Sequence, residues 1–217
     1  MEILVVAATE MEIAPFILQN KTTDVLITGV GAPACMYALT KRLQQKKYDL
    51  IIQAGIAGTF KNSFATGETF LVQKDTFADL GIYERDAFFT LFEKGFVQLN
   101  EVPYKNGWLE NIVEQSFQLT PVNAITVNTV TDKFEQTDLF IKKFDPDIET
   151  MEGAAFHYVC LLEEVPFIQL RSISNFVGER IKTNWKMKEA VQSLNQNLAR
   201  IVTEITTLNS QPETFNS

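Results

Sequence analysis

The chain has 217 residues, of which 46% are hydrophobic and 21% are charged, the proportions of a globular protein with a full core. A formal net charge of −8 at pH 7 argues against a nucleic-acid-binding protein, which would carry a basic surface. No stretch approaches the roughly 20 apolar residues that span a bilayer, so we expect a soluble protein with neither a membrane nor a nucleic acid as partner.

Short apolar runs alternate with helical patterns along the chain. The runs are rich in Val and Ile and show little alternation of polar and apolar residues, which is typical of strands buried on both faces of a sheet. In chain order, we predict strands at 3–8, 24–30, 49–55, 69–73, 124–130 and 166–174, and helices from Glu10 and at 33–46, 108–117, 152–164 and 185–208. The Phe-rich residues 76–107 show no clear pattern.

This repetition of strand and helix predicts the fold class. It is typical of an α/β protein in which helices flank a parallel sheet. We expect one domain over residues 1–208, a three-layer α/β/α arrangement with a mixed, largely parallel central sheet. Residues 209–217 are predicted to form a polar C-terminal tail.

Several predicted strands end in polar residues. Glu10 and Glu12 follow the first strand, Asn175 ends the sixth, and Glu152 precedes an apolar helix. In open α/β sheets, ligands bind beyond the carboxyl ends of the strands, so these are candidate site residues. Each also has a structural explanation, because acidic residues favour helix N-termini and Asn can cap a turn. A purely structural explanation fits Glu152 least well, because an unpaired carboxylate buried among apolar residues is costly in free energy.

The stretch "GVGAPA" (29–34) matches a dinucleotide-binding fingerprint. It follows the second strand, whereas such fingerprints open the first unit, and no acidic residue ends the next strand. A tight turn, in which the backbone approaches a helix or a ligand, is therefore the favoured interpretation.

The single histidine and the two cysteines do not form a recognisable metal or nucleophile site. His157 lies within a predicted helix, and Cys35 and Cys160 are far apart in apolar sequence. We expect a packed or solvated histidine and two buried, reduced thiols, which fits a cytoplasmic protein. No metal and no cofactor are expected.

Taken together, these pieces resemble the nucleoside phosphorylase and nucleosidase family, most closely its hydrolytic members. The resemblance runs over most of the chain and is carried, in this order, by "AATEMEI", "GVGA", "DLIIQAGIAG", "TGETFLV", "ETMEGAAFHYVC" and "VPFIQLRSISN". Within the family, "DTFADLG", "TVNTVTD" and "SISNFVGER" most resemble the futalosine hydrolases, which release hypoxanthine from futalosine on a route to menaquinone. Methylthioadenosine/S-adenosylhomocysteine nucleosidases are near neighbours.

The resemblance implies roles for individual residues. Met151 and Glu152 would face the ribose, with the carboxylate accepting hydrogen bonds from the 2′- and 3′-hydroxyls. Glu12 would activate the water that attacks C1′. Thr129 and Val130 would pack on the base. The segment whose backbone would approach the nucleoside consists of Ile56, Ala57 and Gly58.

Asn175 departs from the adenosine-type nucleosidases, in which an Asp at this place assists N7 as an acid. An amide cannot donate a proton in that way, but its NH₂ group can donate two hydrogen bonds. A 6-oxopurine presents two acceptors, N7 and O6, whereas adenine presents an acceptor and a donor. Asn175 therefore predicts hypoxanthine rather than adenine as the leaving base.

The expected function is hydrolysis of the N-glycosidic bond of a purine nucleoside, most specifically futalosine, by a homodimer or larger homo-oligomer. The resemblance also favours water over phosphate as the nucleophile, because phosphorolytic members of the family carry an Arg-bearing phosphate loop near the N-terminus, whereas "ATEMEIAPF" contains acidic residues and no Arg. Four alternatives stay open: a methylthioadenosine-type nucleosidase, a phosphorylase, a non-catalytic nucleoside-binding module and a dinucleotide-binding domain. Arg85 or Arg180 could hold the far end of the substrate.

Overall fold

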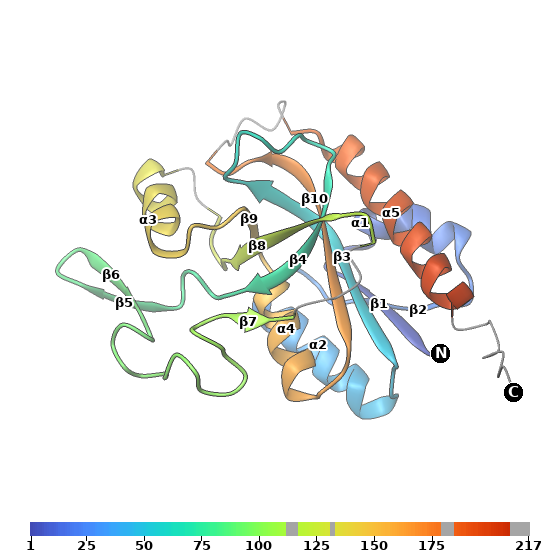
Figure 1. The fold of residues 1–217 in the computed structure, drawn as a ribbon, viewed down its shortest axis with the longest axis horizontal. Coiled ribbons are helices and arrows are strands. Elements are labelled where there is room, and N and C mark those ends of the chain that lie inside the picture. The colour runs from blue at the N-terminus through green and yellow to red at the C-terminus, as the bar shows by residue number, and fades with distance from the viewer. Residues whose placement is uncertain (112–116, 131–132, 179–184, 209–217) are drawn as a thin grey trace, which may run out of the picture.

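The computed structural model describes residues 1–111, 117–130, 133–178 and 185–208 (Figure 1). Its helices are α1 (Glu10–Gln19), α2 (Ala32–Gln45), α3 (Phe134–Phe144), α4 (Gly153–Leu162) and α5 (Met187–Leu208). Its strands are β1 (Ile3–Ala7), β2 (Asp24–Ile27), β3 (Leu50–Thr59), β4 (Thr69–Asp75), β5 (Gly81–Glu84), β6 (Ala87–Thr90), β7 (Leu109–Glu110), β8 (Thr120–Thr126), β9 (Ile148–Thr150) and β10 (Phe167–Phe176).

The main sheet is mixed, as the sequence predicts. Strands β2, β1, β3 and β10 are neighbours and run parallel, and β8 pairs in parallel with both β4 and β9. Antiparallel pairings join β10 to β4 and β3 to β9. Because β3 therefore pairs with both β10 and β9, the strands β3, β10, β4, β8 and β9 close into a ring, which the sequence analysis did not predict.

The ring encloses its own apolar cluster. Strand side chains of alternating positions point inward, as the period-2 geometry of strands requires. The cluster consists of Ala57, Phe70, Val72, Val122, Ala124, Ile148 and Ile173. Apolar side chains from all five strands thus fill the interior of a small barrel, and β1 and β2 extend the sheet from β3.

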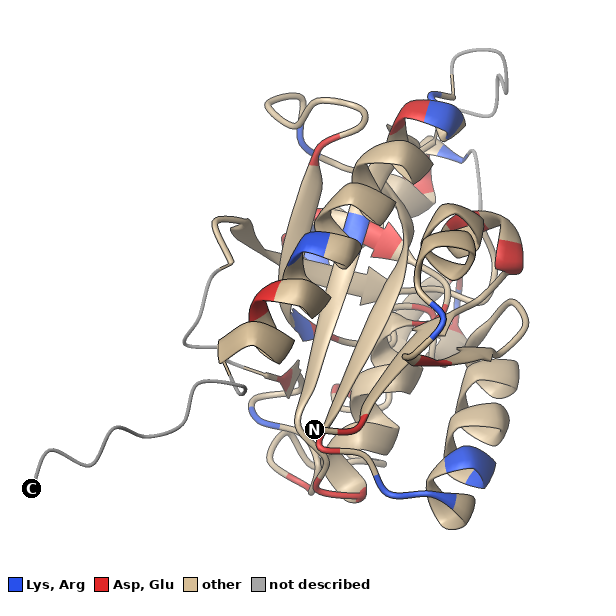
Figure 2. Ribbon diagram, turned by 90° about the vertical axis from the view of Figure 1, so that its right-hand side faces the viewer, with Lys and Arg blue, Asp and Glu red and all other residues tan. Residues whose placement is uncertain are grey.

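Helices cover the sheet on two sides (Figure 1). Helix α5 buries apolar residues at three- and four-residue spacing, among them Leu194, Leu198 and Ile201, and these pack with α1 against β1, β3 and β10. Helices α2 and α4 pack together on the other side, where Leu39 and Phe156 belong to one apolar cluster with Leu4 and Val6 of β1. Charged residues lie mainly on helices and connecting segments, and most of the strand ribbon carries none (Figure 2).

The predicted helix at 108–117 is wrong for the residues that the structure describes. Leu109 and Glu110 form β7, and Leu109 pairs with Asp75 of β4. Phe117 has a φ of +51°, which no right-handed helix permits. Residues 112–116 lie outside the described part of the chain, as do residues 209–217, the predicted tail.

Other boundaries also differ from the prediction. The strand predicted at 124–130 lies at Thr120–Thr126, so the chain leaves the sheet four residues earlier than expected. The segment 76–107 contains the hairpin β5–β6, whose two turn residues, Arg85 and Asp86, have positive φ values of 48° and 66°. Two consecutive left-handed residues are what a tight hairpin turn needs. Helix α3 and strand β9 were not predicted.

None of the described helices is both long and apolar enough to cross a membrane.

Candidate active site

A cavity of about 220 Å³ lies where β1, β3 and β10 end and α4 begins. Its position beyond the carboxyl ends of three parallel strands is the one expected for a ligand site in this class of sheet. The lining residues are Ala8, Thr9, Met11, Glu12, Val30, Ile56, Ala57, Gly58, Val130, Glu149, Thr150, Met151, Glu152, Ser174, Asn175 and Trp185.

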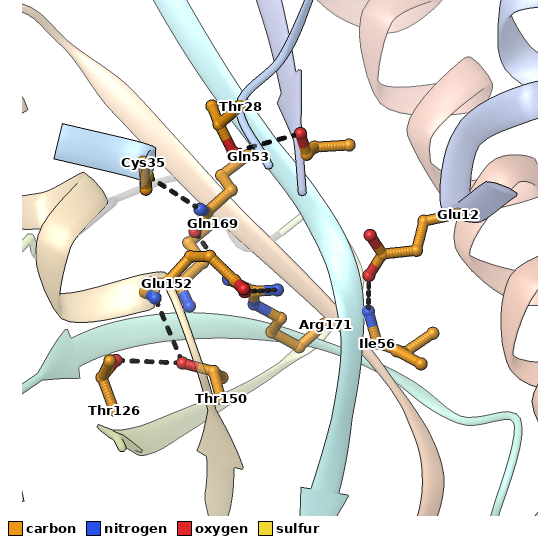
Figure 3. A network of polar contacts seen from close by, with 12 residues as sticks. Glu12, Thr28, Cys35, Gln53, Ile56, Thr126, Thr150, Glu152, Gln169 and Arg171 are labelled. Atoms are coloured by element: carbon orange, nitrogen blue, oxygen red, sulfur yellow. Dashed lines mark hydrogen bonds and ion pairs between the residues drawn. The ribbon is translucent and has the colours of Figure 1, made fainter. Parts of the chain in front are cut away.

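Glu12 both caps α1 and lines the cavity. Its Oε2 accepts hydrogen bonds from the backbone N–H and the hydroxyl of Thr9, at 3.0 and 2.9 Å, which closes a capping box at the helix N-terminus. Its Oε1 accepts from the backbone N–H of Ile56 at 3.1 Å (Figure 3). The structural and the functional explanations of this residue are therefore compatible, because Oε1 keeps acceptor capacity for a ligand or a water.

Glu152 occupies the N-cap position of α4, two residues after the end of β9. Its Oε1 accepts a hydrogen bond of 2.9 Å from the backbone N–H of Gly31, and its Oε2 lies 3.9 Å from an Nη1 atom of Arg171. Burial raises the pKa of Glu152, while the charge of Arg171 and the N–H of Gly31 act to lower it. The costly carboxylate noted in the sequence is thus partly compensated from within the chain.

The "GVGAPA" turn supplies one of these partners. Gly29 and Gly31 have φ values of +86° and +94°, a region that glycine enters without strain. The turn directs the N–H of Gly31 at Glu152 and then opens α2. The interpretation as a tight turn whose backbone approaches a helix is confirmed, because Glu152 is the N-cap residue of α4.

Arg171 is a site residue that the sequence analysis missed. It is 1% exposed, and its Nη2 donates a hydrogen bond of 2.7 Å to Gln53 (Figure 3). Gly55 makes room for it, because a Cβ atom at this position would overlap the guanidinium. The signal in the sequence was a charge inside an apolar strand, "PFIQLRSIS". Its positive charge offsets the negative charge that the cavity carboxylates bring.

Asn175 is the penultimate residue of β10, and both polar atoms of its amide make hydrogen bonds within the chain. Its Oδ1 accepts a hydrogen bond of 2.7 Å from the hydroxyl of Ser174, and its Nδ2 donates one of 2.9 Å to the carbonyl of Phe176. One of the two N–H groups is thereby used within the chain. The other is left for a ligand, so the amide offers a base one hydrogen bond in this geometry rather than two.

The cavity brings together most of the residues predicted from the sequence. Eight of them line it: Glu12, Ile56, Ala57, Gly58, Val130, Met151, Glu152 and Asn175. Thr129 is not among the lining residues, and its exposed backbone N–H donates to Asp79 at 3.2 Å. Arg85 lies in the hairpin turn and does not line the cavity either, and Arg180 lies outside the described residues.

Several lining residues were not predicted. Met11 and Ser174 are direct neighbours of predicted residues, and Glu149 lies three residues before Glu152, so their proximity in sequence was a usable signal. Trp185 had no such signal in the sequence, because it is distant along the chain from the predicted site residues and lines the cavity only in the folded protein.

His157 and the two cysteines are packed in the core. His157 is fully buried, its Nδ1 lies 2.9 Å from the carbonyl of Leu109, and burial lowers its pKa to about 4. Cys35 and Cys160 are buried free thiols, and burial raises the pKa of Cys35 to about 12. Both expectations are confirmed. Within the described ranges, no three His, Cys, Asp or Glu side chains are grouped so as to hold a metal ion.

Solved structures of nucleoside-cleaving enzymes share this fold. Futalosine hydrolase of Helicobacter pylori superposes with a TM-score of 0.77 and 15% identity, covering 94% of this chain and 98% of the other. A mutant of the methylthioadenosine nucleosidase from the same organism, with 5′-methylthioadenosine in its active site, superposes with a TM-score of 0.79 and 15% identity, over the same shares. The chain therefore has a nucleoside phosphorylase-like α/β fold.

Sequence comparison gives the family. The model of the phosphorylase superfamily matches residues 16–207, and the chain belongs to that superfamily. Among its relatives, futalosine hydrolase of Thermus thermophilus is 29% identical over 82% of this chain and 80% of that enzyme. The 5′-methylthioadenosine/S-adenosylhomocysteine nucleosidase of Oceanobacillus iheyensis is 23% identical over 85% and 81%.

Proposed function

We propose that this protein hydrolyses the N-glycosidic bond of futalosine and releases hypoxanthine. The observation that carries the proposal is the pair Glu12 and Glu152, which come from different elements and line one cavity with fixed carboxylate orientations. The 29% identity to futalosine hydrolases of Thermus thermophilus and Streptomyces coelicolor supports the choice of substrate. The two free, buried thiols support a cytoplasmic location.

In this mechanism Glu152 holds the ribose. Each carboxylate oxygen can accept two hydrogen bonds. Oε1 of Glu152 already accepts one from Gly31, so Oε1 and Oε2 can both still accept hydrogen bonds from the 2′- and 3′-hydroxyls. Met151 packs beside the sugar. The diol thereby supplies the polar partners that a buried carboxylate needs.

Glu12 binds and activates the attacking water. The water attacks C1′ as the bond from C1′ to N9 breaks, its proton passes to Glu12, and the electron pair of the broken bond stays with the purine. The carboxylate also offsets the positive charge that develops on the ribosyl group, as in other glycoside hydrolyses.

Water is favoured over phosphate by the charge of the cavity. Of the described residues that line it, three are Glu and none is Lys, Arg or His. Arg171 is not one of these lining residues, and its guanidinium is hydrogen-bonded to Gln53 and lies 3.9 Å from the carboxylate of Glu152. A phosphate dianion would therefore meet like charges without a free cation to bind it.

Asn175 favours a 6-oxopurine as the leaving group. Its remaining N–H can donate to O6 or N7 of hypoxanthine, and it stabilises the departing base by this hydrogen bond rather than by proton transfer. A methylthioadenosine-type nucleosidase is the second candidate, favoured by the similarity to the enzyme of Oceanobacillus iheyensis.

The test is release of free base from futalosine, inosine and methylthioadenosine, each with and without phosphate, measured by chromatography. Hypoxanthine released from futalosine independently of phosphate is the expected result. Adenine from methylthioadenosine alone would favour the second candidate. Turnover only with phosphate would indicate a phosphorylase, and binding without release would indicate a nucleoside-binding module.

A further inference from the structure

Helix α1 bends directly after Glu12, the residue that the proposed mechanism uses as its base. Ile13 has a φ of −124° and a ψ of 15°, which are not helical values, and Pro15 lies inside the helix. A proline has no backbone N–H to donate, and its ring clashes with the carbonyl four residues earlier, so it interrupts the hydrogen bonds of a helix. The first turn, which carries Met11 and Glu12 to the cavity, is therefore not held by an unbroken helix.

A side chain of α5 lies in the place of the missing bond. In a regular helix the N–H of Phe16 would donate to the carbonyl of Glu12, four residues earlier. Here the N–H of Phe16 donates to Oδ1 of Asn195 at 2.9 Å, and Nδ2 of Asn195 donates to the carbonyl of Glu12 at 2.8 Å. The amide of Asn195 thus bridges the two backbone groups that the bend has separated.

Asn195 is itself fixed in the core. It is 6% exposed, and its Nδ2 also donates to the carbonyl of Val191 at 2.6 Å. Helices α1 and α5 lie side by side (Figure 1), and Ile13 and Leu194 belong to one apolar cluster. Asn is a poor helix former, so local propensity does not explain its place inside α5. A side chain without this amide would leave buried backbone groups of α1 without partners, which is costly.

Helix α5 is also tied to the opposite side of the cavity. The N–H of Lys186, just before α5, donates to the carbonyl of Ser174 at 2.8 Å, and the hydroxyl of Ser174 donates to Oδ1 of Asn175 at 2.7 Å. Trp185, next to Lys186, lines the cavity. One helix therefore connects the strand end that carries Asn175 with the turn that carries Glu12.

We propose that Asn195 is a positioning residue for the hydrolysis: by holding the backbone carbonyl of Glu12, it sets the point from which the Glu12 carboxylate reaches the attacking water. Asn195 does not line the cavity, so it acts through Glu12 and not on the substrate. The inference rests on the proposed function, because it needs Glu12 to be the base. A misplacement of a catalytic group by about 1 Å can lower a rate about 100-fold.

The experiment is a double-mutant cycle between Asn195 and Glu12. It uses the wild type, Asn195→Ala, Glu12→Gln and the protein with both changes. Asn195→Asp is a second probe, since a carboxylate can accept from Phe16 but cannot donate to the carbonyl of Glu12. Gln196→Ala, at the next and exposed residue of α5, is the matched control.

The rates come from release of free base, measured with whichever of futalosine, inosine and methylthioadenosine the wild type cleaves best. The assay temperature is one at which thermal unfolding shows every variant to be folded. Asn195→Ala and Asn195→Asp should each lower kcat about 10- to 100-fold with KM nearly unchanged, because the contacts to ribose and base stay in place. The control should match the wild type.

The second half of the cycle separates positioning from a general structural role. In the Glu12→Gln background, Asn195→Ala should lower kcat by less than about twofold, because the base that Asn195 positions is already lost. Equal fold-changes of kcat in the two backgrounds would overturn the positioning role, since a general loss of structure acts in both. An unchanged kcat in Asn195→Ala and Asn195→Asp would overturn it as well.

Failure of the proposed function has a different signature. It would show as wild-type turnover in Glu12→Gln, or as a wild type that releases no base from any of the nucleosides. Either result removes the base that Asn195 would position, and so overturns both proposals. Loss of turnover in Glu12→Gln together with equal fold-changes for Asn195→Ala would overturn only the role of Asn195.

Discussion

At the scale of single residues, the two carboxylate oxygens of Glu12 have different partners and different roles. Oε2 is used by Thr9 at the start of α1, whereas Oε1 accepts one hydrogen bond, from Ile56, and faces the cavity. Since the capping contacts fix the rotation of the carboxylate, the helix N-terminus orients the base that the proposed reaction requires.

Glu12→Gln keeps the length and the acceptor oxygen of this side chain but cannot take a proton. We expect turnover to fall by about 10²- to 10⁴-fold, the usual contribution of a positioned general base. The dissociation constant of the nucleoside should change much less. Steady-state kinetics and calorimetry on the variant measure the two effects. Glu10→Gln, at an exposed residue of the same turn, is the control; unchanged turnover in Glu12→Gln would remove this residue from the base role.

Asn175→Asp tests how the leaving base is recognised. A carboxylate accepts from the 6-amino group of adenine, and a protonated carboxyl group can donate to N7, so the change should favour 6-aminopurines. We expect the kcat/KM ratio of methylthioadenosine to methylthioinosine to rise about tenfold or more. Competition between the two nucleosides, followed by chromatography of the released bases, gives this ratio directly. A ratio equal to that of the wild type would contradict the assignment of Asn175.

At the scale of secondary-structure elements, a buried chain of hydrogen bonds holds the N-terminus of α4. The hydroxyl of Thr126 donates to Asp75 at 3.0 Å and accepts from the N–H of Ala154 at 2.7 Å, and Thr150 accepts from the N–H of Gly153 at 3.1 Å. The N–H groups at a helix N-terminus otherwise lack partners. These contacts join β4, β8, β9 and α4, and they fix the place where Met151 and Glu152 leave the strand.

Asp75 makes this network sensitive to pH. Burial raises its pKa to about 7, against the opposing effects of Thr126 and Arg171. Because the pKa in the folded state exceeds the unfolded value, the folded state binds the proton more tightly. The contribution of Asp75 to the free energy of unfolding is therefore complete below about pH 4 and is lost as the pH rises to about 7.

Asp75→Asn should remove this dependence. Between about pH 4 and 7, the wild type should lose up to about 4 kcal/mol of stability relative to the variant, from roughly three pKa units at 1.36 kcal/mol each. Urea unfolding at a series of pH values measures the difference. His157, with its lowered pKa, contributes with the opposite slope in both proteins, so it cancels in the comparison. Asp86→Asn, at an exposed turn, is the control; parallel curves for the wild type and Asp75→Asn would contradict the expectation.

At the scale of the whole molecule, exposed apolar side chains border the cavity. Met11 is 61% exposed, Val30 57% and Val130 37%, and all three line the site. Contiguous apolar surface at a ligand site is typically covered by substrate or by another subunit. This surface supports the expectation of a homo-oligomer.

Light scattering coupled to gel filtration tests the assembly. We expect a molar mass of at least twice the 24.6 kDa of the chain. Val30→Asp, which places a charge on the exposed apolar rim, should lower that mass toward one chain because a buried unpaired charge is costly. A wild type that runs as a monomer at micromolar concentration would contradict the prediction.

The sequence by itself indicated six of the strands, the helices α1, α2, α4 and α5, and eight of the sixteen residues that line the cavity. The strands could be predicted because burial on both faces selects Val and Ile. Glu12, Glu152 and Asn175 were candidates because they lie at strand ends, whereas the other five cavity residues were assigned through the family resemblance. The sequence also marked Glu152 as a carboxylate in need of partners, since the unusual feature, an acid at the head of an apolar helix, is local.

Only the tertiary structure decided which residues are the partners of the Glu152 carboxylate. Gly31, Arg171 and Glu152 come from a turn, a strand and a helix start that meet through the pairing of β1, β3 and β10. The closing of five strands into a ring and the strand β7 in place of a helix at 108–117 likewise depend on long-range pairing. Local propensity does not encode such contacts, because the free energy that fixes them comes from residues far apart in the chain.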